Sequence, residues 1–141
     1  MTQLEQEFVE GKLSNLSQYI DEIEEFFDKY SNEDILNNFE KKHAAERMLE
    51  LAVESMININ QHFIKSYNLE EQDDFQSTFY TLAENDFLPE DFAEKIAPVV
   101  GIRNRIVHGY EKIDHELFIR EFRENYQDFE KYKELIEKQI D

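Results

Sequence analysis

The sequence predicts an all-α protein, an antiparallel bundle of about five helices. Only three glycines and two prolines occur among the 141 residues, which leaves little room for turn-rich β structure. Charged residues make up 34% of the chain, as is typical of amphipathic helices. Apolar residues recur at spacings of three and four along most of its length. The length and the hydrophobic content of 40% suit a single domain over residues 1–141 with one core.

The first two helices are expected at 13–30 and 33–67. The apolar stripe of the first contains Leu13, Leu16, Ile20, Ile23, Phe27 and Tyr30. An upstream turn with Leu4 and Phe8 extends this pattern, and Ser31-Asn32 ends it and can cap the next helix. The second helix contains neither Gly nor Pro, and its apolar positions are Ile35, Phe39, Leu49, Ala52, Val53, Met56, Ile59 and Phe63.

The third and fourth helices follow a polar, acidic loop at 68–74. Asp74 is expected to cap a short third helix whose apolar positions are Phe75, Phe79 and Leu82. Pro89 starts the fourth helix, with acidic residues in its first turn to meet the positive end of the helix dipole. Pro98 interrupts this helix and is expected to kink or split it, because proline removes one backbone hydrogen bond.

The fourth helix is expected to end at His108, since Gly109 is a natural left-handed terminator. Asp114 then caps the last helix, and Ile113 is placed to pack onto Phe118. The apolar stripe of this helix contains Phe118, Phe122, Tyr126, Phe129 and Ile136. Helices of these lengths with short loops predict an antiparallel bundle.

The protein is strongly acidic, with 33 acidic and 15 basic residues and a net charge of −18. Such a surface repels nucleic acid overall, so a polyanion must bind at a local basic patch. Residues 103–112 and 41–47 each carry a net charge of +2. The acidic runs at 1–28 and 70–94 are either solvated helix faces or a surface that repels bulk RNA or docks a basic partner.

The chain has no cysteine, which excludes disulfides and thiolate metal sites. It has no apolar run near the roughly 18 residues that span a bilayer and no signal-peptide pattern, so we expect a cytoplasmic protein without a membrane partner.

Candidate functional residues gather between Gly101 and Tyr110. Arg103 offers a planar fork to phosphate oxygens, and His108 titrates near neutral pH. On an ideal helix these two side chains point about 140° apart, so they converge only if the helix frays before Gly109. The simpler alternative is that His108 meets the helix dipole, Arg103 pairs with a carboxylate and Tyr110 packs as a ring.

The segment Arg103-Asn104-x-x-x-His108-x-Tyr110 resembles the Arg-x4-His-x-Tyr signature of HepT-like toxins, a branch of the HEPN superfamily. Ala45 to Glu54, followed by Asn58-Ile59 and His62, is similar to the second helix of that family. The likeness covers roughly residues 43–119.

This resemblance implies a homodimeric helical bundle in which the motifs of the two subunits face each other. It implies a metal-independent ribonuclease toxin that needs no cofactor, with RNA as its substrate. The antitoxin would be a minimal nucleotidyltransferase (MNT) that attaches AMP to the motif tyrosine.

Carried over residue by residue, the resemblance makes Arg103 and His108 catalytic and Tyr110 the modification site. Asn104 matches the usual Arg-Asn pair and orients the pocket. Arg105 is left open between an exposed surface charge and a phosphate contact.

No metal-binding set is evident among the scattered histidines His43, His62, His108 and His115. The first two are expected to face solvent or the edge of the core. Glu46 and Arg47 either lie near the site or, as the simpler alternative, form an intrahelical ion pair. The rival interpretation, favoured by the acidic surface, is a non-catalytic bundle that binds a nucleotide or a protein.

Overall fold

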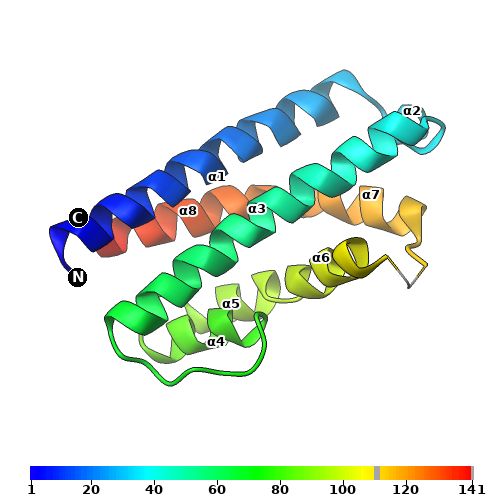
Figure 1. The fold of residues 1–141 in the computed structure, drawn as a ribbon. Coiled ribbons are helices and arrows are strands. Elements are labelled where there is room, and N and C mark those ends of the chain that lie inside the picture. Colours follow the sequence, from blue (N-terminus) through cyan, green and yellow to red (C-terminus); the bar gives the residue numbers. More distant parts are fainter. Residues whose placement is uncertain (110–111, 141) are drawn as a thin grey trace.

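The computed structural model describes residues 1–109 and 112–140, and this part of the chain is all-α (Figure 1). It contains eight helices and no strand: α1 (Gln3–Lys29), α2 (Asn32–Leu36), α3 (Phe39–Ser66), α4 (Ser77–Glu84), α5 (Glu90–Ile96), α6 (Val99–His108), α7 (His115–Asn125) and α8 (Gln127–Ile140). Among these described residues, no helix combines the length and hydropathy needed to cross a bilayer.

The helices form an antiparallel bundle, as the sequence predicts (Figure 1). The long helices α1 and α3 run side by side in opposite directions, and α4 to α6 return beneath α3. Helix α7 packs against α2, and α8 then runs back along α1, so that the two ends of the chain lie close together. Helix α6, which carries the candidate residues, packs against α3.

The expected number of about five helices is wrong for the described residues, because three expected helices are each split in two. The helix expected at 33–67 breaks at 37–38, where Asn38 is extended and its side chain caps α3 by accepting a hydrogen bond from the Lys41 amide. Asparagine favours such caps over helix interiors, so it can end a helix without Gly or Pro. Pro98 splits the fourth helix into α5 and α6, as predicted.

The last expected helix divides at Tyr126, between α7 and α8. The Tyr126 amide still donates to the Phe122 carbonyl four residues back, but the Phe129 amide donates to the Tyr126 carbonyl only three residues back. This tighter turn changes the direction in which the following side chains point.

The predicted start and stop signals act where the sequence places them. The Ser31 side chain accepts from the Asp34 amide at the start of α2, and Asp114 accepts from the Leu117 amide at the start of α7. Gly109 adopts φ 68°, the left-handed conformation that ends α6 directly after His108. At the N-terminus, Thr2 caps α1 and confirms that this helix includes the upstream turn.

A buried polar cluster ties three helices together in the core. The Tyr132 hydroxyl of α8 lies 2.6 Å from Asn60 Oδ1 and 3.1 Å from the Met56 carbonyl of α3. Asn60 Nδ2 donates to Thr78 Oγ1 of α4 over 3.1 Å, and this hydroxyl donates to the Phe75 carbonyl over 2.6 Å. Because buried polar groups are costly without partners, this cluster fixes how α3, α4 and α8 pack.

The start of α4 differs from the expectation in one respect. Asp74 does cap this region, because its carboxylate accepts from both the amide and the hydroxyl of Ser77. The helix itself begins only at Ser77, so Phe75 lies outside it. Phe79 and Leu82 are fully buried as predicted, whereas Phe75 is 41% exposed rather than part of the core.

Candidate functional site

Arg103 on α6 is held in place by three neighbouring side chains. Its Nη2 atom lies 3.0 Å from Glu54 Oε1 on α3, and its Nη1 atom donates to Asn104 Oδ1 over 3.1 Å. The ring of Phe75 lies 5.7 Å from the guanidinium carbon. The Arg103 side chain is only 16% exposed, and its buried Nε donates no hydrogen bond to any residue that the structure describes. The guanidinium is therefore fixed in orientation.

Helix α6 does not fray before Gly109, so the condition under which Arg103 and His108 would converge is not met. Helix α6 is regular from Val99 to His108, so its geometry sets Arg103 and His108 about 140° apart around the helix axis. Arg103 turns towards α3, whereas His108 is exposed at the end of α6. The two side chains are therefore not brought together on one face of α6.

The other predicted site residues are Asn104, Arg105 and Tyr110. Asn104 lies one helical turn before His108 and accepts a hydrogen bond from Arg103, and its role in orienting the pocket stays a prediction. Arg105 is exposed, and its role as a surface charge or a phosphate contact stays a prediction. Tyr110, the predicted modification site, lies outside the described residues.

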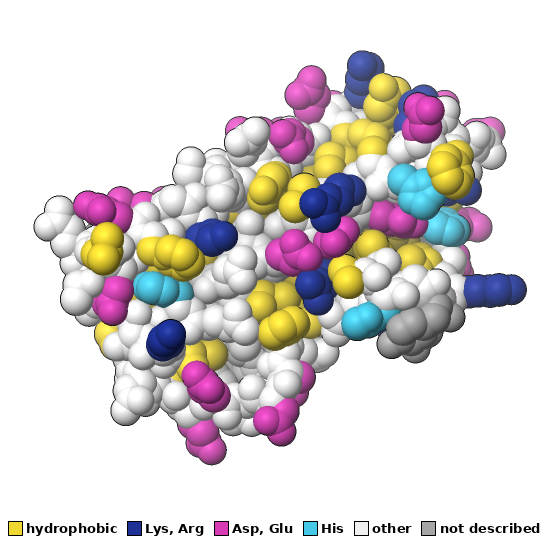
Figure 2. Space-filling view, in the orientation of Figure 1, with side chains coloured by type: hydrophobic (Ala, Val, Ile, Leu, Met, Phe, Trp, Pro, Cys, Tyr) yellow, Lys and Arg dark blue, Asp and Glu magenta, His cyan; other side chains and the backbone are white. Residues whose placement is uncertain are grey.

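A row of glutamates on α3 includes Glu54, the partner of Arg103, which sequence reasoning did not predict. Glu46, Glu50 and Glu54 follow one another at intervals of four, so they share one face of the helix. Figure 2 shows acidic and basic side chains next to each other along α3 on this face. The regular spacing was visible in the sequence, but only the packing of α6 against α3 shows which of the three meets Arg103.

Two of these glutamates form pairs within α3, as expected for this segment. Glu50 lies 3.1 Å from Arg47, and Glu46 lies 3.3 Å from His43. Glu46 also lies 3.5 Å from His115 at the start of α7. Two histidines that looked unrelated in the sequence therefore share one carboxylate that is only 13% exposed. No cluster suited to a metal ion, with three or more His, Cys, Asp or Glu, occurs in residues 1–109 and 112–140.

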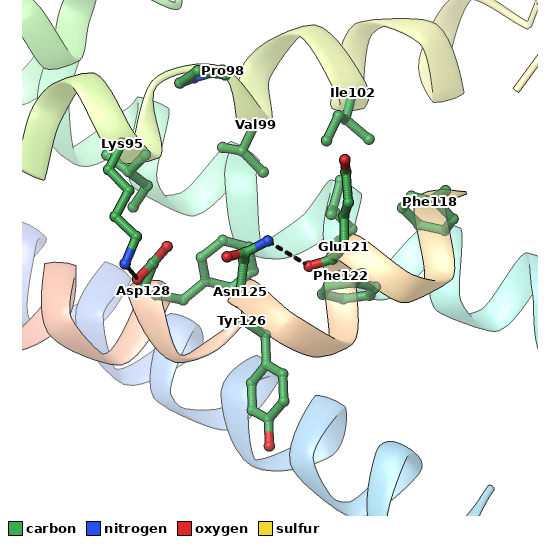
Figure 3. A pocket seen from close by; sticks show the side chains of 13 residues that line it. Lys95, Pro98, Val99, Ile102, Phe118, Glu121, Phe122, Asn125, Tyr126 and Asp128 are labelled. Carbon is green, nitrogen blue, oxygen red and sulfur yellow. Dashed lines mark hydrogen bonds and ion pairs between the residues drawn. The ribbon is translucent and has the colours of Figure 1, made fainter. Parts of the chain in front are cut away.

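A separate hollow of about 260 Å³ lies between α5–α6 and α7–α8 (Figure 3). Its apolar walls include Ile96, Val99, Ile102, Phe118, Phe122 and Phe129. Pro98 and Tyr126 both line it, so the two helix breaks meet at this hollow. The ion pair of Lys95 and Asp128, 3.1 Å apart, closes one end. Because neither Arg103 nor His108 lines it, this hollow is distinct from the candidate site.

Comparison with known proteins gives the family. Residues 16–136 match the HepT-like family, described as Ribonuclease HepT-like. The tRNA nuclease HepT of Aphanizomenon flos-aquae is 32% identical over 114 residues, which are 81% of this chain and 77% of that protein. The mRNA nuclease HepT of Shewanella oneidensis is 24% identical over 88 residues, 62% of this chain and 66% of that protein.

Solved structures share the fold at lower identity. The tri-AMPylated Shewanella oneidensis HEPN toxin in complex with MNT antitoxin has a TM-score of 0.83 and 20% identity, over 97% of this chain and 98% of that one. A toxin–antitoxin structure with AMP-PNP has a TM-score of 0.84 and 18% identity, over 93% and 98%. The family match covers most of the sequence and includes Arg103, Asn104 and His108. The chain belongs to the HepT-like ribonuclease family.

Proposed function

We propose that this protein is an endoribonuclease toxin of a toxin–antitoxin pair that cleaves RNA in the cytoplasm without a metal ion. The observation that carries the proposal is the fixed guanidinium of Arg103, held by Glu54 and Asn104 on the helix that ends at His108. An arginine fork suits the two oxygens of a phosphodiester, and it stays charged at any physiological pH. The nuclease names of the relatives in Aphanizomenon flos-aquae and Shewanella oneidensis support the same activity.

In the proposed reaction, RNA supplies its own nucleophile. A base removes the proton of a ribose 2′-hydroxyl, whose oxygen then bonds to the adjacent phosphorus. The bond from phosphorus to the 5′-oxygen breaks, and an acid protonates that oxygen as it leaves. The products are a 2′,3′-cyclic phosphate and a 5′-hydroxyl. Arg103 steadies the charge on the phosphate oxygens, and His108 serves as base or acid because imidazole titrates near neutral pH.

The proposal includes a twofold-symmetric homodimer that sets the two 103–110 segments across one groove. One chain supplies one His108, whereas each cleavage needs two proton transfers. The regular α6 helix supports this arrangement, because it directs Arg103 and His108 of one subunit away from each other. A partner subunit would bring a second imidazole and a second arginine to the same groove.

We further propose that a nucleotidyltransferase antitoxin silences the enzyme by attaching AMP to Tyr110. Tyr110 follows His108 by two residues in the sequence. An added phosphodiester there is anionic and bulky, so it would pair with Arg103 and occupy the place of the substrate phosphate. The AMPylated toxin of Shewanella oneidensis in complex with MNT antitoxin, which shares this fold, supports the proposal.

An RNA cleavage assay in the presence of a chelator tests the proposed reaction. His108→Ala should lower the cleavage rate by roughly 10²–10⁴, the usual range for loss of a positioned acid–base group. His115→Ala is the matched control, because His115 is another solvent-accessible histidine, which lies at the start of α7 and pairs with Glu46. Loss of cleavage with chelator would contradict the metal-independent reaction, and full activity of His108→Ala would contradict the role of His108.

The second candidate function is a non-catalytic bundle that binds a nucleotide or a protein. The net charge of −18 favours it, since a free ribonuclease needs some attraction to RNA. Binding of AMP or of a protein partner, without RNA cleavage by the wild-type protein at any RNA concentration, would identify this function.

A further inference from the structure

Phe75 is an exposed aromatic ring beside the proposed phosphate-binding arginine. It lies in the loop between α3 and α4, where 41% of its surface is open to solvent. Its ring lies 5.7 Å from the guanidinium carbon of Arg103. A phenyl ring left open in this position can stack on a further planar group.

Phe75 also lines a hollow of about 240 Å³ between the end of α3 and the loop that follows it. Gln61, Ile64 and Lys65 form its α3 side, and Glu71 to Asp74 form its loop side. The volume is below the roughly 300–1,000 Å³ of clefts for drug-sized ligands, so it suits one planar ring system. Figure 2 shows acidic side chains gathered below α3, where this loop runs.

The core holds Phe75 in its place through the buried polar cluster. Thr78 Oγ1 donates to the Phe75 carbonyl over 2.6 Å and accepts from Asn60 over 3.1 Å. Tyr132 in turn lies 2.6 Å from Asn60 Oδ1. Because the backbone of Phe75 is anchored in this way, stacking on its ring costs little ordering of the loop.

We propose that Phe75 and this hollow form a subsite for a nucleobase of single-stranded RNA, next to the phosphate held by Arg103. The inference rests on the proposed function, because it takes Arg103 as the phosphate ligand. Single-stranded RNA is commonly recognised by aromatic rings that stack on splayed-out bases. Arg103 and the Phe75 ring lie side by side, so one could contact a phosphate and the other a neighbouring base of the same RNA strand.

The charge of the hollow favours a base over a phosphate. Glu71, Asp73 and Asp74 line it with three carboxylates against the single ammonium group of Lys65, so the hollow is negative on balance and repels a phosphate group. Carboxylates accept hydrogen bonds from the amino groups of cytosine, adenine or guanine, whereas uracil has no amino group. The subsite should therefore prefer amino-bearing bases to uracil.

Binding of non-cleavable oligomers tests the subsite. The probes are fluorescent 2′-O-methyl oligoadenylate and oligouridylate, and an abasic tetrahydrofuran phosphate oligomer of equal length. Phe75→Ala should weaken oligoadenylate binding by roughly 5- to 150-fold, as loss of one stacked base does, and leave abasic binding unchanged. Phe75→Tyr should restore binding, whereas Phe75→Leu, which keeps the apolar bulk without a ring, should not. Oligouridylate should bind more weakly than oligoadenylate.

Two further variants separate the subsite from the proposed function. Arg103→Ala should weaken both the abasic and the base-bearing oligomers, because it removes a phosphate contact. Phe8→Ala is the matched control, since Phe8 is also exposed, by 45%, but stacks on His62 and not on Arg103. This variant should bind the abasic and the base-bearing oligomers as tightly as the wild type.

Equal weakening of the abasic and base-bearing oligomers by Phe75→Ala would overturn the subsite, and so would no weakening of either. If abasic binding still depended on Arg103 in those cases, the proposed function would stand. If the wild-type protein bound none of the three oligomers, both inferences would fail.

Discussion

Arg103 on α6 and Glu54 on α3 form an ion pair, with 3.0 Å between Nη2 and Oε1. The pair joins two helices whose paired residues are 49 positions apart in the sequence. It orients the guanidinium before any ligand arrives, so less ordering is needed when a phosphate binds. The same carboxylate competes with that phosphate for the arginine. Glu54 is therefore a positioning residue in the proposed reaction.

Replacement of Glu54 should separate these two effects. Glu54→Ala should lower kcat about tenfold, because Arg103 loses its orientation. It should not raise KM, because the RNA phosphate no longer competes with the Glu54 carboxylate for Arg103. Glu54→Gln keeps an acceptor for Arg103 and should restore most of kcat. The measurement is steady-state cleavage of a single-stranded RNA.

Glu50→Ala is the matched control for Glu54. Glu50 lies one turn away on the same face of α3 but pairs with Arg47, whose side chain is 62% exposed. Its removal should change stability by less than about 1 kcal/mol and leave kcat unchanged. A rise in KM with unaltered kcat for Glu54→Ala would show that Glu54 does not position the arginine.

Arg103→Lys should lower the cleavage rate about 10²-fold although it keeps the positive charge. An ammonium group cannot form the planar fork that now contacts Glu54 and Asn104 and would contact the phosphate. Single-turnover cleavage measures the effect directly. Arg47→Lys, at an exposed position on α3, is the comparison and should retain wild-type rates. Cleavage by Arg103→Lys at the wild-type rate would mean that charge alone suffices.

Mixing of subunits should reveal whether two chains share one site. If both His108 side chains serve each cleavage, wild-type chains that exchange with an excess of His108→Ala chains should lose activity per wild-type subunit. Exchange with His115→Ala chains, which keep His108, should leave that activity unchanged. Constant activity per wild-type subunit in both mixtures, or a fully active monomer, would rule out the shared groove.

Tyr110→Phe should keep much of the nuclease activity and escape neutralisation by the cognate nucleotidyltransferase. The substitution removes only the hydroxyl that would accept AMP. Mass spectrometry of the intact chain after co-expression measures the modification. Tyr67→Phe, at a tyrosine that is 39% exposed, should still be modified and silenced. Equal silencing of Tyr110→Phe and wild type would refute the proposed switch.

Tyr132 should make the folded state less stable in alkaline solution. Burial raises the pKa of the Tyr132 phenol well above its ordinary value of 10.0. Above pH 10.0 the phenol ionises in the unfolded chain, whereas in the folded chain it stays protonated until the pH reaches the raised pKa. Unfolding then releases a proton, so this residue lowers the free energy of unfolding by about 1.4 kcal/mol per pH unit.

Tyr132→Phe should remove that alkaline dependence while costing about 1–2 kcal/mol at neutral pH, because Asn60 Oδ1 loses the hydroxyl that donates to it. Urea unfolding at several pH values measures both effects. Tyr126→Phe is the control, because Tyr126 is only half-buried and should change the alkaline slope less. Parallel pH curves for wild type and Tyr132→Phe would contradict the assignment.

The sequence by itself determined the features that depend on near neighbours. Apolar spacing predicted the all-α bundle, and Asp114 and Gly109 marked helix ends that the structure confirms. Pro98 predicted the break between α5 and α6. Each signal acts through backbone groups within a few residues, so a local pattern is sufficient to predict it. The motif around Arg103 and His108 likewise indicated the family without any contact information.

Only the tertiary structure decided which distant groups meet. Glu46, Glu50 and Glu54 have the same local pattern, yet the packing of α6 against α3 brings Glu54 alone of the three onto Arg103. Phe75 continued an apolar stripe in sequence, but α4 begins after it and leaves its ring exposed beside the arginine. These outcomes depend on how the helices cross and on which residues fill the core, and no single segment contains that information.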